Sequence, residues 1–97
     1  MGSEARSFYV LAYDIADDKR RARIARLMES LGERVQGSVF EAYLNTVELQ
    51  SLLRKVRKVL RAEEDGLRIY LLCETCRGKI VVEGQGRTTP PPGLKII

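Results

Sequence analysis

Apolar positions along the chain follow two periods, and these periods predict the order of its elements. Residues 8–14 are apolar at successive positions until Asp14, which is typical of a central strand buried on both faces. The next apolar residues recur every three or four positions and stop at Gly32, which predicts a helix over residues 18–31. This helical stripe consists of Ile24, Leu27, Met28 and Leu31.

The middle of the chain repeats the order of strand and then helix. Residues 35–44 are rich in strand-forming side chains but contain Gly37, so they form one bent strand or two short strands that meet near Gly37. Asn45 and Glu48 resemble a capping box, which predicts that a second helix begins there and ends before Gly66. Its apolar stripe consists of Leu49, Leu52, Leu53, Val56 and Leu60.

The last third of the chain changes in composition at residue 84. Residues 67–73 and 79–83 are expected to be strands joined by a turn at 76–78. The segment 84–93 is rich in glycine and proline, which forbids regular structure and predicts an extended arm. The apolar residues 94–97 that follow are expected to add an edge strand to their own sheet or to a second copy.

These elements predict one α+β domain. If the middle segment is two strands, the order is βαββαβ, a ferredoxin-like sandwich with two helices on one face of an antiparallel sheet and an extra C-terminal strand. A chain of 97 residues has room for one modest core. We therefore assign residues 1–83 to the domain and 84–97 to a C-terminal arm, which packs on its own sheet or on the partner in a homodimer.

The charge of the chain favours a polyanion as its partner. The sequence has 17 Lys+Arg against 13 Asp+Glu, a net charge of +4, and nucleic acid is the leading candidate. The cations gather on the two predicted helices, where an arginine fork binds phosphate oxygens well. An alternative for Arg20 and Arg21 is an ion pair with Asp17, Asp18 or Asp14. The expected nucleic-acid contacts are Arg20, Arg21, Arg54, Lys55, Arg57 and Lys58.

Several kinds of chemistry are excluded or weakened by composition. The sequence has no histidine, so catalysis that needs an imidazole is excluded. Cys73 and Cys76 form a CxxC, but no other cysteine exists to complete a zinc site within one chain. A thioredoxin-like pair would open a helix, whereas a turn is expected here, so we interpret both thiols as structural or incidental. No apolar stretch reaches the about 20 residues that span a bilayer, and a cytoplasmic protein is expected.

Asp14 is the leading candidate for chemistry. A carboxylate at the end of a buried strand must emerge into solvent or have a partner, because burying an unpaired charge costs several kcal/mol. It is either a ligand for a hard cation such as Mg²⁺ or a polar group that caps the turn to the next helix. A metal nuclease usually has more than one carboxylate at its metal site, and this chain offers one. A metal site therefore needs Asp14 from two subunits across a two-fold axis.

Several short motifs occur together in a fixed order over residues 8–73. They are Tyr13-Asp14-Ile15, Asp17-Asp18-Lys19-Arg20-Arg21, Gly32-Glu33-Arg34-Val35-Gln36, Ser38-Val39-Phe40-Glu41 and Asp65-Gly66-Leu67-Arg68-Ile69-Tyr70. This set resembles the small CRISPR-associated adaptation protein, or endoribonuclease, of the "Cas-two" family. The resemblance implies a ferredoxin-like homodimer that bridges two dimers of the CRISPR adaptation integrase and sets the length of captured DNA spacers.

The resemblance also implies roles for matching residues. Asp14 matches the family's metal-binding aspartate, with Mg²⁺ as the expected cofactor, and the residues that match those linked to nuclease activity are Tyr13, Arg21, Arg23, Arg34 and Phe40. Two functions follow. We favour a scaffold that binds duplex DNA during spacer acquisition, because the sequence is poor in general bases and carboxylates. The alternative is a metal-dependent endonuclease that hydrolyses phosphodiesters of single-stranded RNA or double-stranded DNA.

Overall fold

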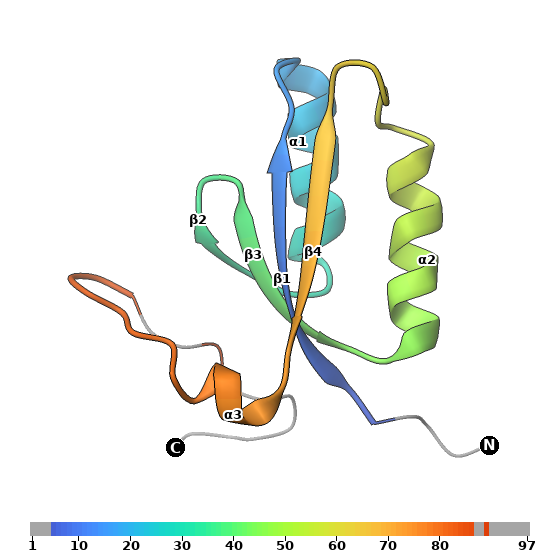
Figure 1. The fold of residues 1–97 in the computed structure, drawn as a ribbon. Coiled ribbons are helices and arrows are strands. Elements are labelled where there is room, and N and C mark those ends of the chain that lie inside the picture. The colour runs from blue at the N-terminus through green and yellow to red at the C-terminus, as the bar shows by residue number, and fades with distance from the viewer. Residues whose placement is uncertain (1–4, 87–88, 90–97) are drawn as a thin grey trace.

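The computed structural model describes residues 5–86 and Thr89. Seven elements follow one another in this part of the chain (Figure 1). They are β1 (Ser7–Asp14), α1 (Asp18–Glu29), β2 (Glu33–Gln36), β3 (Val39–Leu44), α2 (Thr46–Arg57), β4 (Gly66–Leu72) and α3 (Glu74–Arg77). None of the helices within these residues is long and apolar enough to cross a membrane.

The four strands form one antiparallel sheet in the order β2-β3-β1-β4. The central strand β1 pairs with β3 on one side and with β4 on the other, so that Phe8 lies opposite both Tyr43 and Leu72. This topology confirms the predicted ferredoxin-like α+β sandwich. The bend near Gly37 separates two strands, β2 and β3, which decides between the two alternatives left open by the sequence.

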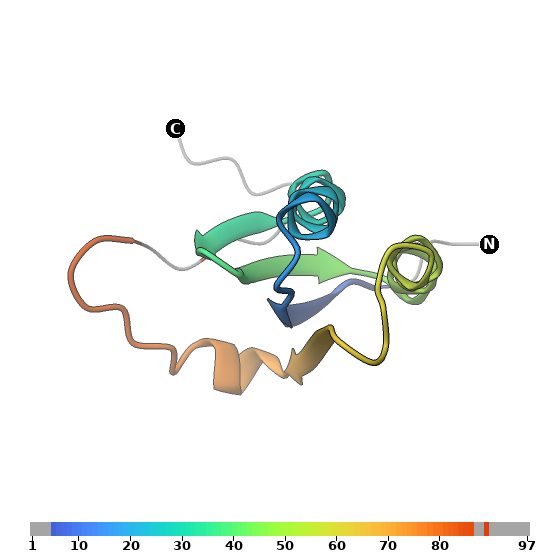
Figure 2. The same cartoon turned by 90° about the horizontal axis from the view of Figure 1, so that it is seen from above.

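One face of the sheet is covered by α1 and α2, and α3 lies on the other side (Figure 2). Side chains alternate between the faces along each strand, and the register places Leu11 beside Phe40 on the face toward the two helices. These two side chains are almost fully buried, as are Ile24 and Met28 of α1 and the α2 residues Leu52 and Val56. Burying each such side chain stabilises the fold by about 1.5–3 kcal/mol.

The connection from α1 to β2 passes very close to β3. A Cβ atom on Gly32 would lie 2.4 Å from the carbonyl oxygen of Glu41 and 2.8 Å from the Cβ of Ala42. Only glycine fits this approach without moving backbone, so Gly32 fixes where α1 ends and how it lies on the sheet. α1 and α2 are both shorter than predicted, and Leu31 and Leu60 lie just beyond their last turns.

The prediction of a turn at 76–78 followed by a strand over 79–83 is wrong. Cys73 caps the short helix α3, in which the amide of Arg77 donates to the carbonyl of Cys73 at 2.8 Å. No described strand of the chain runs beside residues 79–83, and without a partner strand β-branched residues have no ladder to join. Val81 and Val82 are accordingly 78% and 42% exposed.

The remaining predictions for the C-terminus stay predictions. The expected strand over 94–97 lies outside the described residues, and so does most of the arm assigned to 84–97. Thr89 is described, and it is buried against the sheet, with its hydroxyl donating to Oε1 of Glu41 at 2.5 Å.

Candidate nucleic-acid interface

Asp14 and Tyr13 are neighbours in sequence but lie on opposite faces of the sheet. Asp14 is the exposed last residue of β1, opposite Gly66 of β4. Tyr13 is buried on the helix face, its ring stacked on Phe40 with centroids 6.2 Å apart, and its hydroxyl donates to the carbonyl of Gly37 at 3.4 Å. Tyr13 and Phe40 thus pack the core beside the β2–β3 turn and do not join Asp14.

Arg34 belongs to the same packed cluster. Its guanidinium lies over the ring of Phe40, 5.2 Å from the centroid, and pairs with Oε2 of Glu29 at 3.4 Å. The ring of Phe40 is fully buried. The contacts of Arg34 connect β2 to the end of α1, on the face away from Asp14.

Arg20 and Arg21 are both satisfied within the chain. Arg20 donates from Nε to Oδ2 of Asp65 at 2.9 Å and from Nη2 to Glu64 at 3.0 Å, and it also lies 4.0 Å from Asp17. Arg21 donates to the carbonyl of Ile15 at 2.8 Å, and it pairs with Asp18. The ion pairs that the sequence left open as an alternative are therefore present.

The hydrogen bond between Arg20 and Asp65 changes the pKa of both side chains. The guanidinium hydrogen bond lowers the pKa of the Asp65 carboxyl below its ordinary value of 3.8, and a hydrogen bond from the backbone amide of Arg61 lowers it further. The same contact raises the pKa of Arg20. Arg20 therefore stays charged, and its charge is largely neutralised by these carboxylates.

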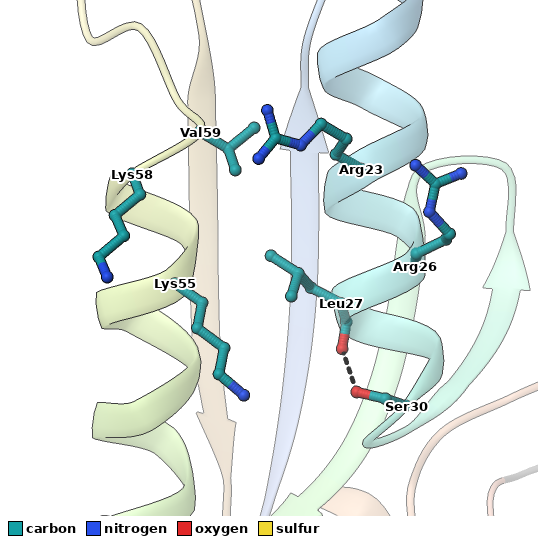
Figure 3. Close-up of a pocket in the computed structure, with 7 residues that line it drawn as sticks. All are labelled: Arg23, Arg26, Leu27, Ser30, Lys55, Lys58 and Val59. Atoms are coloured by element: carbon teal, nitrogen blue, oxygen red, sulfur yellow. Dashed lines mark hydrogen bonds between the residues drawn. The ribbon is translucent and has the colours of Figure 1, made fainter.

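A basic groove lies between α1 and α2 on the outer side of the helical layer (Figure 3). It encloses about 450 Å³. Arg23 and Arg26 reach it from α1, while Lys55 and Lys58 reach it from the end of α2. The residues that line the groove are Arg23, Arg26, Leu27, Ser30, Lys55, Lys58 and Val59.

The four cations of the basic groove differ from Arg20 and Arg21 in their partners. Within residues 5–86, no carboxylate forms an ion pair with Arg23, Arg26, Lys55 or Lys58. Cations gathered along one groove repel one another, and an anion placed between them removes that repulsion. The arrangement is suited to binding closely spaced phosphates.

Part of this groove was predictable. Lys55 and Lys58 were expected to contact nucleic acid, and the family resemblance linked Arg23 to nuclease activity. Arg26 was missed because its position suits an ordinary solvated helix face. The signal was the matching spacing of three residues in Arg23/Arg26 and Lys55/Lys58, which places each pair on one helix face.

Asp14 lies apart from any larger cluster of metal-ligating side chains in the described part of the chain. Among the residues described, no group of three or more Asp, Glu, Cys or His side chains gathers closely enough to hold an ion. Mg²⁺ prefers one or two carboxylates together with water and phosphate oxygens. A magnesium site that combines Asp14 from two copies of the chain stays a proposal.

Comparison with known proteins decides the family. The family model for CRISPR associated protein Cas2 matches residues 7–80. The chain belongs to the Cas2 family. The Synechocystis protein named CRISPR-associated endoribonuclease Cas2 3 is 43% identical and aligns over 92% of this chain and 97% of its own length. The Thermus thermophilus CRISPR-associated endonuclease Cas2 2 is 46% identical, over 90% and 89% of the two chains.

Solved structures agree with this assignment of fold and family. A hypothetical protein of Thermus thermophilus, TT1823, superposes with a TM-score of 0.78 at 44% identity, over 88% of this chain and 99% of that one. Cas2 of Streptococcus pyogenes gives 0.72 at 26% identity, over 79% and 99%. A chain of a partial Cas6-RT-Cas1–Cas2 complex gives 0.64 at 32% identity, over 78% and 89%. The chain is thus a CRISPR-associated protein with the Cas2 fold.

Proposed function

We propose that the chain is a CRISPR adaptation protein that dimerises, bridges integrase dimers and holds duplex DNA by its phosphates during spacer acquisition. The observation that carries the proposal is the basic groove, which four cations line without forming an ion pair to any carboxylate in the described part of the chain. A similar chain occurs in a complex with Cas1, which supports an integrase as the partner. These contacts make DNA binding independent of base sequence, because the phosphates are the same at every position.

In this proposal a second copy of the chain also pairs with the strand-forming segment at 79–83. β4 is an edge strand of the sheet within residues 5–86, and an edge offers unpaired backbone groups to another chain. Val81 and Val82, in the segment after α3, are 78% and 42% exposed and belong to no strand of the single chain's described residues. Dimerisation supplies two basic grooves per assembly, so one duplex is held at two points.

The salt dependence of DNA binding tests the basic groove. Each phosphate contact releases a counterion and contributes about 0.9 to the slope of log affinity against log salt. In the double variant Lys55→Ala with Lys58→Ala, we expect the slope to be smaller in magnitude than in the wild type by up to about 2. Fluorescence anisotropy with a labelled duplex measures it.

The matched control removes two cations from the same helix outside the groove. Arg54→Ala with Arg57→Ala changes the net charge by the same amount, and both arginines are exposed. A smaller loss of slope in this control supports the groove as the binding site. Equal losses in the two variants would mean that only net charge matters.

A second candidate function is the metal-dependent endonuclease, with Asp14 as its acidic residue. The relatives in Synechocystis and Thermus thermophilus are named endoribonuclease and endonuclease, and Asp14 is exposed at the end of β1. In this proposal two copies each contribute Asp14 to hold Mg²⁺, which would stabilise charge on the phosphate in the transition state.

Cleavage of labelled single-stranded RNA and double-stranded DNA in Mg²⁺ tests this candidate. Cutting by the wild type that is lost in Asp14→Asn, but kept in a control such as Glu63→Gln on the α2–β4 connection, supports the nuclease. Equal traces of cutting in all three proteins would show a contaminant and leave the scaffold as the function.

A further inference from the structure

Cys73 and Cys76 occupy the junction between β4 and α3. The sequence pattern placed a turn there, but the structure has a strand followed directly by a helical turn, with Cys73 as its N-cap. The backbone amide of Cys76 donates to Sγ of Cys73 at 3.4 Å. Both cysteines are exposed, so neither serves to fill the core.

We propose that Cys73 and Cys76 form a reversible dithiol–disulfide site that exchanges with small-molecule disulfides of the glutathione class. The Cys73 thiolate attacks one sulfur of the small disulfide and releases the first small thiol. The Cys76 sulfur then attacks Cys73 in the mixed disulfide and releases the second small thiol. Two electrons pass from the protein to the small disulfide, and the two protons end on the released thiols.

The geometry of the pair supports ring closure. Sγ of Cys73 lies 3.4 Å from the backbone nitrogen of Cys76, so it already points at the residue whose thiol would close the disulfide ring. A zinc site does not compete within one chain, since the sequence has no histidine and no third cysteine.

The two thiols differ in acidity in the direction that this order of attack requires. A hydrogen bond from the backbone amide of Cys76, followed by the thiol–thiol hydrogen bond, lowers the pKa of Cys73. The same thiol–thiol contact raises the pKa of Cys76. Because the thiolate is the nucleophile in exchange, Cys73 is the attacking residue and Cys76 the resolving one.

The pair sits next to the residue that fastens α3 to the sheet. The guanidinium of Arg77 lies 5.4 Å from the ring centroid of Phe8 and 5.5 Å from that of Tyr43. Arg77 also donates to the carbonyl oxygen of Thr89, whose hydroxyl binds Glu41. A disulfide one residue before Arg77 would hold α3 closed, so oxidation would strengthen this attachment on the face of the sheet opposite α1 and α2.

Thiol trapping tests the chemistry directly. The full chain is equilibrated with buffers of reduced and oxidised glutathione that contain a chelator, alkylated with a maleimide, and weighed by intact mass spectrometry. We expect the wild type to lose two hydrogens and both alkylation sites as the buffer becomes oxidising. Cys76→Ser is expected to stop as a mixed disulfide with glutathione at Cys73, and Cys73→Ser to react more slowly.

Other products would overturn the proposal. Two alkylated thiols in the most oxidising buffer would show that no disulfide forms, and a stable glutathione adduct on the wild type would show that Cys76 does not resolve it. A disulfide between two chains would assign the cysteines to a different linkage. The serine variants are expected to fold, because both cysteines are exposed and serine is a good N-cap.

Hydrogen exchange tests the effect on α3. The amides of Arg77 and Gly78 donate within α3 at 2.8 and 3.0 Å, and we expect them to exchange several-fold more slowly in the oxidised protein. The double variant Cys73→Ser with Cys76→Ser is expected to show the same exchange in both buffers. Equal exchange in oxidised and reduced wild type would overturn the link between the disulfide and Arg77.

Discussion

Arg20 and Asp65 join the start of α1 to the connection that leads into β4. The Asp65 side chain is fully shielded from solvent and that of Arg20 is 16% exposed. Asp65 accepts hydrogen bonds from Nε and Nη2 of Arg20 and from the backbone amide of Arg61. Each of these donors stabilises the shielded carboxylate of Asp65. Removing Arg20 would leave the negative charge of Asp65 buried and unpaired, which destabilises the fold.

The variant Arg20→Ala is therefore expected to lower the melting temperature by several degrees. The matched control is Arg26→Ala on the same helix, which removes the same charge from a residue without an acidic partner in the described structure and is expected to change the melting temperature little. Circular dichroism melts of the two variants and the wild type check this. Equal shifts would show that Arg20 contributes only its charge.

The acid stability of the protein should depend on Asp65. Its folded pKa is lowered from the ordinary value of 3.8, so its contribution is present above that value and is lost as the pH falls through it toward the folded pKa. Urea unfolding at several acidic pH values is expected to show a steeper loss of stability in the wild type than in Asp65→Asn. Parallel curves for the two proteins would contradict a role for Asp65.

For the arginines of α1, the sequence predicted that they bind anionic groups but did not predict which partner each one has. Arg20, Arg21, Arg23 and Arg26 lie on one helix with similar local composition, and spacing alone did not separate the two arginines held by carboxylates and carbonyls from the two in the basic groove. Asp65 is 45 residues from Arg20, so this pairing is a product of the fold and not of local sequence.

The connection between α1 and β2 shows how one element is placed by a single residue. Gly32→Ala is expected to cost about 1–3 kcal/mol, because the new methyl group would collide with the backbone of β3 at Glu41. Gly37→Ala is the control, since a Cβ there has nothing within 4 Å. Denaturant unfolding of both variants measures the difference, and similar costs would show that β3 moves freely to make room.

Elements whose signal is local were predictable, and those that need a distant partner were not. The periodicities of β1, α1, α2 and β4 predicted their type and where each begins, and the structure confirms this, although both helices end earlier than predicted. Residues 79–83 have equally good strand formers but no described neighbour strand, so composition alone predicted a strand that the single chain does not form. The helical turn of α3 was missed because four residues are too few to show a period.

On the scale of the whole molecule, the exposed valines at 81 and 82 should control self-association. We expect Val81→Ser with Val82→Ser to shift a dimer toward monomer in light scattering while leaving the melting curve of the monomer unchanged. Val47→Ser is the control, because Val47 is 68% exposed on the first turn of α2. A dimer that persists in the double variant would place the interface elsewhere on the chain.

The central place of β1 also sets the order in which the newly made chain can fold. β1 ends at Asp14, but its second neighbour β4 begins only at Gly66, about fifty residues later. At synthesis rates of about 5–20 residues per second, one edge of β1 stays unpaired for roughly 3–10 s after it leaves the ribosome. During translation this strand, apolar on both faces, is the segment most in need of a chaperone.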